Sequence, residues 1–160
     1  GKLSSKRVVV ATNGFANQLL KLKDVNPARA QVLITKPINN LKIKGTFHYD
    51  EGYYYFRNIG NRVLFGGGRN LDFIRETSTE FVLNSKIHKH LDKLLKSIIL
   101  PDTNFEVEQR WCGIMGVGTE KKPIIKKISP NIVCAVRMGG MGVAIGSVVG
   151  LKAAQLISKS

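Results

Sequence analysis

A glycine-rich segment close to the C-terminus constrains the fold of this chain more than any other feature. Residues 138–146 read MGGMGVAIG and lie between a strand-like run and an apolar, helix-like stretch. Glycines in this setting are typical of a dinucleotide-binding turn, where backbone amides approach phosphate at a helix N-terminus. The spacing of Gly140, Gly142 and Gly146 is GxGxxxG, one residue longer than that fingerprint, and the few residues that follow leave no room for a complete βαβ unit. We therefore predict that this turn does not open a Rossmann unit.

Two roles remain open for this turn. The N-terminus of a helix carries about half a positive charge and several free N–H groups. The turn can therefore serve an anionic group other than a dinucleotide pyrophosphate. Alternatively, its glycines only allow the helix to pack tightly on a sheet, and the spacing does not decide between the two.

The remaining pattern predicts an α+β fold, in which an antiparallel sheet with a helix is accompanied by terminal strand and helix pieces of an α/β layer. Residues 7–12 (RVVVAT) are typical of a buried parallel strand. Residues 84–100 repeat apolar side chains at the helical period, with Asn84 as N-cap and Pro101 as a stop. Further strands are expected at residues 30–35, 45–49, 53–57, 62–66, 106–115 and 132–136, a turn at 58–61, and further helices at 15–22 and 143–158.

The last helix, residues 143–158, is apolar on nearly all sides. It is shorter than the ~20 residues that span a bilayer, and Lys152 interrupts it. We therefore expect no membrane span, and a helix buried against a sheet.

The chain has a net charge of +14, which invites a nucleic-acid interpretation. Its lysines and arginines are scattered, without a basic arm or RGG tract, so we disfavour a nucleic-acid partner. Cys112 and Cys134 form no CxxC pair, and His88 and His90 point to different faces of their helix, so no metal site is expected. Two isolated, apolar-flanked thiols favour a reducing, cytoplasmic setting.

Six segments in this order resemble the C-terminal half of the D-amino-acid-oxidase-like FAD-dependent oxidoreductases, a family that includes glycine, sarcosine and gamma-glutamylputrescine oxidases. The similarity extends over nearly the whole chain. The segments are VVVATNGFA (8–16), NPARAQ (26–31), EGYYYFR (51–57), RVLFGGGR (62–69), WCGIMGVGTEKKPII (111–125) and RMGGMGVAIG (137–146).

The resemblance implies a discontinuous FAD-binding domain. Residues 1–25 and 128–160 would belong to it, and residues 26–127 would form a substrate-binding domain with an antiparallel sheet and a helix. The GxGxxG portion, which comes first in such enzymes, is absent from this sequence. We therefore expect an N-terminal FAD-binding segment as a partner, and a chain that is inactive alone.

The resemblance also implies where the cofactor FAD binds. An ATG-like stretch passes the cofactor in this family, and a glycine turn directs amides at the flavin C2 carbonyl, where a reduced flavin gathers negative charge. FAD itself carries the redox chemistry, so no catalytic side chain is assigned. The matching cofactor-binding residues are Ala11, Thr12, Gly14, Gly140, Met141, Gly142, Val143 and Ala144.

For a small-molecule amine or amino-acid substrate, the resemblance implies Tyr53, Arg69 and Met115 as binding residues. Tyr53 matches a tyrosine that helps to hold the substrate carboxylate in glycine oxidase. That enzyme has arginines at the positions of Met115 and Gly140, and neither methionine nor glycine can form their bidentate carboxylate pairs. Arg69 replaces an apolar active-site residue and is either a relocated carboxylate anchor or an exposed turn arginine. Two further candidates, with surface ion pairs as the alternative, are Arg29 and Arg110.

Three functional hypotheses follow. The leading one is an FAD-dependent enzyme that oxidises a C–N bond by hydride transfer to flavin N5. The second is a basic module that binds RNA or an acidic partner without catalysis. The third is a tRNA-modifying branch of the same flavoenzyme family.

Overall fold

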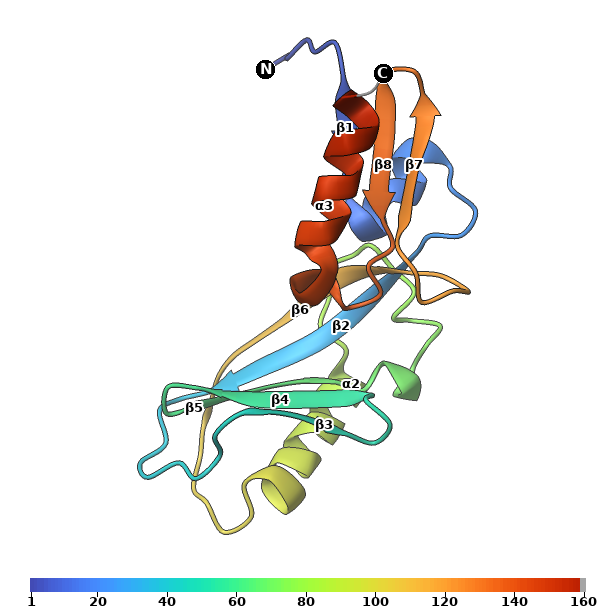
Figure 1. Ribbon diagram of the computed structural model, residues 1–160. Coiled ribbons are helices and arrows are strands. Elements are labelled where there is room, and N and C mark those ends of the chain that lie inside the picture. The colour runs from blue at the N-terminus through green and yellow to red at the C-terminus, as the bar shows by residue number, and fades with distance from the viewer. Residues whose placement is uncertain (159–160) are drawn as a thin grey trace. The chain divides into compact units, whose positions relative to one another are not determined.

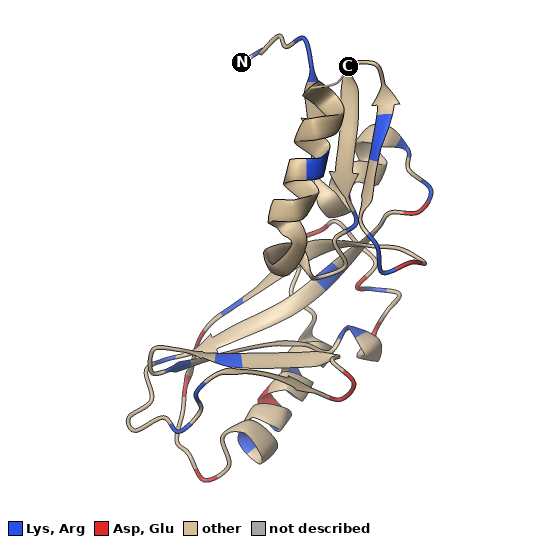
Figure 2. Ribbon diagram, viewed as in Figure 1, with Lys and Arg blue, Asp and Glu red and all other residues tan. Residues whose placement is uncertain are grey.

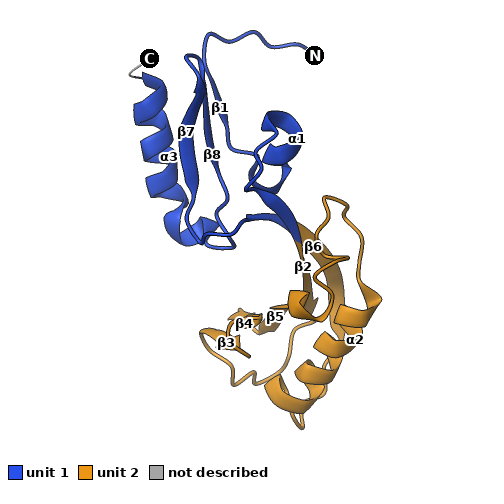
Figure 3. Ribbon diagram, turned by 90° about the vertical axis from the view of Figure 1, so that its right-hand side faces the viewer, with its two compact units in different colours: residues 1–28, 114–160 blue, residues 29–113 orange. Residues whose placement is uncertain are grey.

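The structure, a computed structural model, describes residues 1–158 and divides into two compact units. Unit 1 consists of Gly1–Ala28 and Ile114–Ser160, and unit 2 consists of Arg29–Gly113 (Figure 3). Unit 1 therefore combines both ends of the sequence. The α+β class predicted from the sequence is confirmed.

Unit 1 contains a three-stranded sheet and a long helix (Figure 1). Strand β1 (Val8–Val10) pairs in parallel with β8 (Ile132–Val136), and β7 (Ile124–Ser129) pairs antiparallel with the other edge of β8. Helix α3 (Gly142–Ser158) packs on this sheet. The two ends of the sequence thus meet in one layer, as a parallel β1–β8 pair.

Alternate residues of β8 face opposite sides of the sheet, so the strand supports two small cores. The second side carries a short 3-10 helix, η1 (Asn13–Phe15), followed by α1 (Ala16–Leu20), and Figure 3 shows α1 and α3 on opposite sides of the strands. The core under α3 contains Val133, Ala135, Val149 and Ala153. The other core contains Ala16, Leu22, Val25, Cys134 and Val136.

Unit 2 is built on a five-stranded sheet in the order β3-β4-β5-β2-β6. Within it, the neighbouring pairs β3–β4, β4–β5 and β5–β2 are antiparallel. Two of the strands, β2 and β6, also contain residues of unit 1. The bounds are β2 (Asn26–Thr35), β3 (Thr46–Tyr49), β4 (Tyr54–Ile59), β5 (Arg62–Gly67) and β6 (Val107–Val117).

Helix α2 (Ser85–Leu94) covers this sheet and continues as a π-helical turn, Leu95–Ile99. The predicted N-cap is confirmed, because Asn84 Oδ1 accepts hydrogen bonds from the amides of Lys86 and Ile87. Apolar side chains at the helical period meet the sheet in one core. Its largest buried members are Leu33, Tyr54, Phe65, Ile87, Leu91 and Leu95.

Two of the sequence-based element predictions were wrong. Strand β7 was not predicted, because Lys126 and Lys127 interrupt its apolar run, which an edge strand tolerates. Strand β2 begins at Asn26, four residues before the predicted start of the strand at residues 30–35. In this strand Pro27 is the second residue, a position near the strand end where its missing N–H is tolerated.

Helix α3 and strand β1 are less buried than predicted. Only Val149 and Ala153 of α3 are buried, while its first-turn residue Val143 is fully exposed. In β1, Val8 and Val9 remain 44% and 42% exposed, because β1 is an edge strand with a neighbour on one side. By contrast, Cys112 and Cys134 are both buried. None of the described helices combines the length and apolar character that a bilayer crossing requires.

Candidate functional site

The parallel β1–β8 pair gathers the predicted cofactor residues of unit 1. The C-terminal ends of parallel strands lie at one edge of a sheet, which is where ligands bind in α/β layers. One connection leaves β1 at this edge and another leaves β8. They are joined by Asn13, whose Oδ1 accepts a hydrogen bond from the Met138 amide at 3.1 Å. Ala11, Thr12 and Gly14 therefore lie beside the turn that opens α3.

Gly14 packs directly against the backbone of Met115, which brings this predicted substrate residue to the same region. A Cβ on Gly14 would lie 2.5 Å from the carbonyl oxygen of Met115. Gly140, with a φ of +86°, is close to the same residue, and a Cβ there would lie 3.4 Å from the Met115 sulfur. The structure thus brings Met115, Gly14 and Gly140 together, although they are far apart in sequence.

The first turn of α3 offers backbone amides without partners. The amides of Met141 and Ala144 are engaged, since they donate to the carbonyls of Met138 and Met141 at 2.9 and 3.0 Å. Within residues 1–158, the amides of Gly140, Gly142 and Val143 donate no hydrogen bond. This end of the helix is exposed, and it therefore presents free donors and the positive end of the helix dipole.

A buried arginine, Arg137, anchors the turn that precedes α3. Arg137 is 6% exposed, adopts a left-handed backbone with a φ of +64°, and forms an ion pair with Asp24. Its Nε also donates to the Lys122 carbonyl at 2.8 Å. Asp24 in turn accepts from the amide and hydroxyl of Thr119, each at 3.0 Å. Sequence reasoning missed Asn13, Asp24 and Arg137, because no spacing pattern links residues so far apart.

An apolar groove of about 300 Å³ runs along β1 and α3 in unit 1. Small residues on one face of α3 leave it open. Its walls include Val9, Ala11, Gly146, Gly150 and Ala154.

In unit 2, Tyr53 and Arg69 are brought together around Phe73. The Tyr53 carbonyl accepts a hydrogen bond from the Gly68 amide at 3.0 Å, directly before Arg69. The Arg69 guanidinium carbon lies 4.9 Å from the centre of the Phe73 ring, and the Tyr53 ring meets Phe73 edge-on at 6.4 Å. Sequence reasoning identified the first two residues but missed Phe73, which carries no motif.

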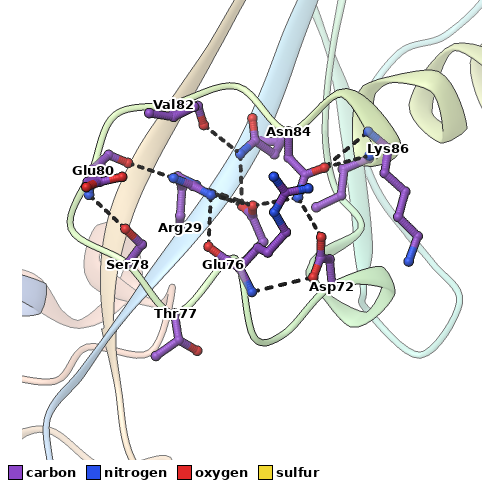
Figure 4. A network of polar contacts seen from close by, with 12 residues as sticks. Arg29, Asp72, Glu76, Thr77, Ser78, Glu80, Val82, Asn84 and Lys86 are labelled. Atoms are coloured by element: carbon purple, nitrogen blue, oxygen red, sulfur yellow. Dashed lines mark hydrogen bonds and ion pairs between the residues drawn. The ribbon is translucent and has the colours of Figure 1, made fainter.

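A fully buried carboxylate, Glu76, is the centre of a polar network in the loop that precedes α2 (Figure 4). It accepts hydrogen bonds from Arg29 at 2.9 Å, Gln31 at 2.8 Å and Asn84 at 3.0 Å. Burial opposes ionisation of Glu76, but these hydrogen bonds and the charge of Arg29 outweigh it, and its pKa is lowered. The alternative reading of Arg29 as a surface ion pair is therefore wrong, since the pair is buried.

The network extends to His88, which is also buried. His88 Nε2 lies 3.1 Å from Gln31 Oε1, and Nδ1 lies 3.1 Å from a guanidinium nitrogen of Arg110. Since Arg110 can only donate, Nδ1 is the acceptor and Nε2 carries the proton of a neutral ring. Arg110 also pairs with Asp92 at 2.7 Å. Both side chains are partly exposed, so the alternative of a surface ion pair is confirmed for Arg110.

Lysine and arginine positions are spread along the ribbon over strands, helices and loops (Figure 2). This distribution follows the scatter of lysine and arginine along the sequence. It lends the RNA-binding alternative no added support.

One comparison with known proteins identifies the family of this chain. A family model described as FAD dependent oxidoreductase (DAO) matches residues 1–156. A search of curated protein sequences gives no match.

Solved structures share the fold at low sequence identity. L-proline dehydrogenase from P. horikoshii is 22% identical, with a TM-score of 0.74 over 96% of this chain and 42% of its own. Iminodiacetate oxidase from Chelativorans sp. BNC1 is 17% identical, with a TM-score of 0.73 over 99% and 44%. Glycine oxidase from Bacillus cereus ATCC 14579 is 13% identical, with a TM-score of 0.72 over 96% and 43%. The chain therefore spans less than half the length of these proteins.

Proposed function

This chain belongs to the DAO family of FAD-dependent oxidoreductases, and on that premise we propose that it is part of an enzyme that oxidises the C–N bond of an amine or amino acid. The parallel β1–β8 pair carries the proposal, because it places residues 11–14 beside the exposed N-terminus of α3. The structurally similar proteins are named for L-proline, iminodiacetate and glycine, each a small amino or imino acid. A substrate of that size class is the simplest assignment for this chain.

The residues at this edge fit the acceptor groups of a flavin. We propose that the free amides of Gly140, Gly142 and Val143 donate to the C2 carbonyl and N1 region, where the positive helix end favours developing negative charge. Gly14 and Gly140 allow the two connections to pack closely against Met115 at this edge. When bound, FAD supplies the oxidising power by accepting a hydride from the carbon next to the substrate nitrogen. The proposed cofactor set remains Ala11, Thr12, Gly14 and residues 140–144.

The chain's own residues would bind and orient the substrate. We propose Tyr53, Arg69 and Met115 as substrate-binding residues, each argued from the surroundings in its own unit. Met115 contributes an apolar, polarisable surface beside Gly140. Tyr53 and Arg69 contribute polar groups held by Phe73.

We further propose that unit 1 is completed by an FAD-binding segment outside these 160 residues. Support comes from the 42–44% coverage of the similar structures and from the apolar surface of unit 1. Val8 and Val9 are partly exposed on the open edge of β1, next to the groove along α3. A strand added to this edge would bury both.

The test is a comparison of bound flavin. The intact protein and the 160-residue chain would be purified, incubated with FAD, desalted and measured for visible flavin absorbance. We expect stoichiometric FAD on the intact protein and little on the chain alone. An intact protein that stays colourless after reconstitution would contradict the proposal.

A further inference from the structure

Arg137 holds a backbone conformation that is unfavourable for a residue with a side chain, directly before the turn that opens α3. Its φ of +64° is left-handed, and the turn continues in the same region, with φ values of +57° at Gly139 and +86° at Gly140. Glycine adopts this conformation freely, whereas arginine does not. Such strain persists only where the surrounding structure imposes it, and it concentrates at functional sites. Contacts of the Arg137 side chain must therefore hold this backbone in place.

The Arg137 side chain is held by a carboxylate and by backbone carbonyls. Its guanidinium forms an ion pair with Asp24, and Nη1 also lies 3.4 Å from the Asp24 carbonyl oxygen. Nε donates to the Lys122 carbonyl at 2.8 Å. The Asp24 carboxylate is itself fixed, because Oδ1 accepts from the amide and the hydroxyl of Thr119. Since the arginine side chain is only 6% exposed, water competes little for these charge-assisted hydrogen bonds.

A glycine makes room for this ion pair. A Cβ at Gly118 would lie 2.5 Å from Cδ of Arg137 and 2.7 Å from the Asp24 carbonyl oxygen, so the pair packs on bare backbone. The same segment also holds the turn, because the Gly116 carbonyl accepts from the Gly139 amide at 2.9 Å. Residues 116–119 therefore bind both the ion pair and the turn that follows Arg137.

We propose that Asp24 and Arg137 form a positioning pair for the flavin cofactor. The pair fixes the direction in which the chain leaves β8, and with it the free amides of Gly140, Gly142 and Val143. Donors stabilise developing charge best when they are oriented before the ligand arrives. This inference rests on the proposed function, because it assigns those amides a ligand. Both residues act through the turn rather than by contact with the reacting atoms.

The first experiment examines the turn without cofactor. Amide hydrogen exchange of the intact apoprotein would be followed by NMR at Met138 and Gly139, whose amides donate to Asn13 and Gly116. Asp24→Asn removes the charge and keeps the shape of the side chain. Exchange at both amides should accelerate about 10-fold through local opening, while the amides of β8 keep their wild-type rates. Unchanged rates at the two amides, or equal acceleration along β8, would overturn the inference.

Glu120→Gln is the matched control. The Glu120 carboxylate lies 3.9 Å from Nη2 of Arg137 and its side chain is 64% exposed. The substitution thus removes the same charge near the same arginine from a weak, solvent-exposed contact. Amide exchange in the turn and FAD affinity should both stay at wild-type values. If Glu120→Gln acts like Asp24→Asn, net charge rather than positioning is the cause, and the assignment of the pair is wrong.

Arg137→Gly separates the side chain from the backbone. Glycine relieves the left-handed strain but loses the ion pair. The FAD dissociation constant of the intact protein should rise about 3- to 10-fold, as expected if the binding conformation of the turn falls to about 10–30% occupancy. Adding Asp24→Asn to this variant should change little, because its partner is already gone. A glycine variant that binds FAD as tightly as the wild type would overturn the inference.

The reduction potential of bound FAD distinguishes positioning from a merely structural role. Amides directed at the N1 and C2 region favour the reduced flavin, so misplacing them should weaken reduced FAD more than oxidised FAD. In Asp24→Asn, a preferential loss of about 3- to 10-fold lowers the two-electron potential by about 15–30 mV. Weaker FAD binding with an unchanged potential would leave the pair a structural role only and overturn the inference.

The two proposals can fail separately. Faster exchange at Met138 and Gly139 in Asp24→Asn, in a protein that never retains FAD, would refute the proposed function and leave the pair as the anchor of the turn. A protein that retains FAD, with wild-type affinity in both Asp24→Asn and Arg137→Gly, would refute only the positioning role.

Discussion

The side chain of Asn13 accepts a hydrogen bond from the amide of Met138, and these two residues are 125 positions apart in sequence. The contact joins the connection after β1 to the connection after β8, at the edge of the sheet where α3 begins. Asn13 holds a left-handed backbone with a φ of +45°, which asparagine tolerates better than most residues. One residue thus fixes the relation between the two segments that we assign to the cofactor.

Asn13→Ala should reduce the free energy of unfolding by about 1–3 kcal/mol, because it removes the acceptor for Met138 and disfavours the left-handed backbone. Asn13→Asp keeps both properties and should stay close to wild type. Urea denaturation measures the difference. If the aspartate variant loses as much as the alanine variant, the hydrogen bond to Met138 is not the reason.

Gly142→Pro tests the free amides of α3. Gly142 is the first residue of the helix, where proline is accepted and only the amide N–H is lost. Under the proposed function, FAD affinity of the intact protein should fall about 10-fold, as expected for one hydrogen bond to a charged acceptor. Gly142→Ala retains the amide and is the matched control. Equal FAD dissociation constants for the two variants would show that this amide does not bind the cofactor.

Gly14→Ala should be strongly destabilising. Its Cβ would lie 2.5 Å from the Met115 carbonyl oxygen, and backbone cannot move aside cheaply, so a loss of about 1–3 kcal/mol is expected. Gly113→Ala is the control, because nothing lies within 4 Å of its Cβ. The comparison uses thermal or urea unfolding, and similar losses at both positions would contradict the close packing.

Glu76→Gln should cost about 3–5 kcal/mol, since it leaves the buried Arg29 cation without a counter-charge. The same substitution at Glu106, whose pair with Lys36 is exposed, should leave the free energy of unfolding nearly unchanged. Chemical denaturation of the two variants side by side decides the point. A small loss for Glu76→Gln would mean that the network relaxes around the neutral side chain.

Stability should fall as the pH drops below about 6.5. Burial and the nearby Arg110 charge lower the pKa of His88 below its ordinary value of 6.5, with Asp92 and Glu76 opposing in part. The unfolded chain therefore binds a proton at His88 before the folded one does, so this contribution to stability is complete above pH 6.5 and is lost as the pH falls toward the folded pKa. Urea unfolding at pH 7.5 and 5.5 measures the change. His88→Gln should reduce it, and an unchanged pH dependence in that variant would exclude His88 as its source.

Local patterns determined much of this protein. The helical period and the Asn84 cap predicted α2, the β-branched run predicted β1, and the ordered segments indicated the family that the family model then confirmed. These features depend on neighbours within a few residues, so a sequence displays them directly. Strand β7 was missed because two lysines interrupt its apolar run. Its pairing with β8, which stabilises it, is not visible in the local sequence.

Only the tertiary structure decided which distant residues meet. The parallel β1–β8 pair brings Asn13 to Met138, and the packing of the loop before α2 buries Glu76 with Arg29. The same long-range packing places the Arg69 guanidinium against the Phe73 ring, and its Nε has no hydrogen-bond partner within residues 1–158. Such relations arise from long-range packing, in which burial and hydrogen bonding are shared by segments that carry no common sequence signal.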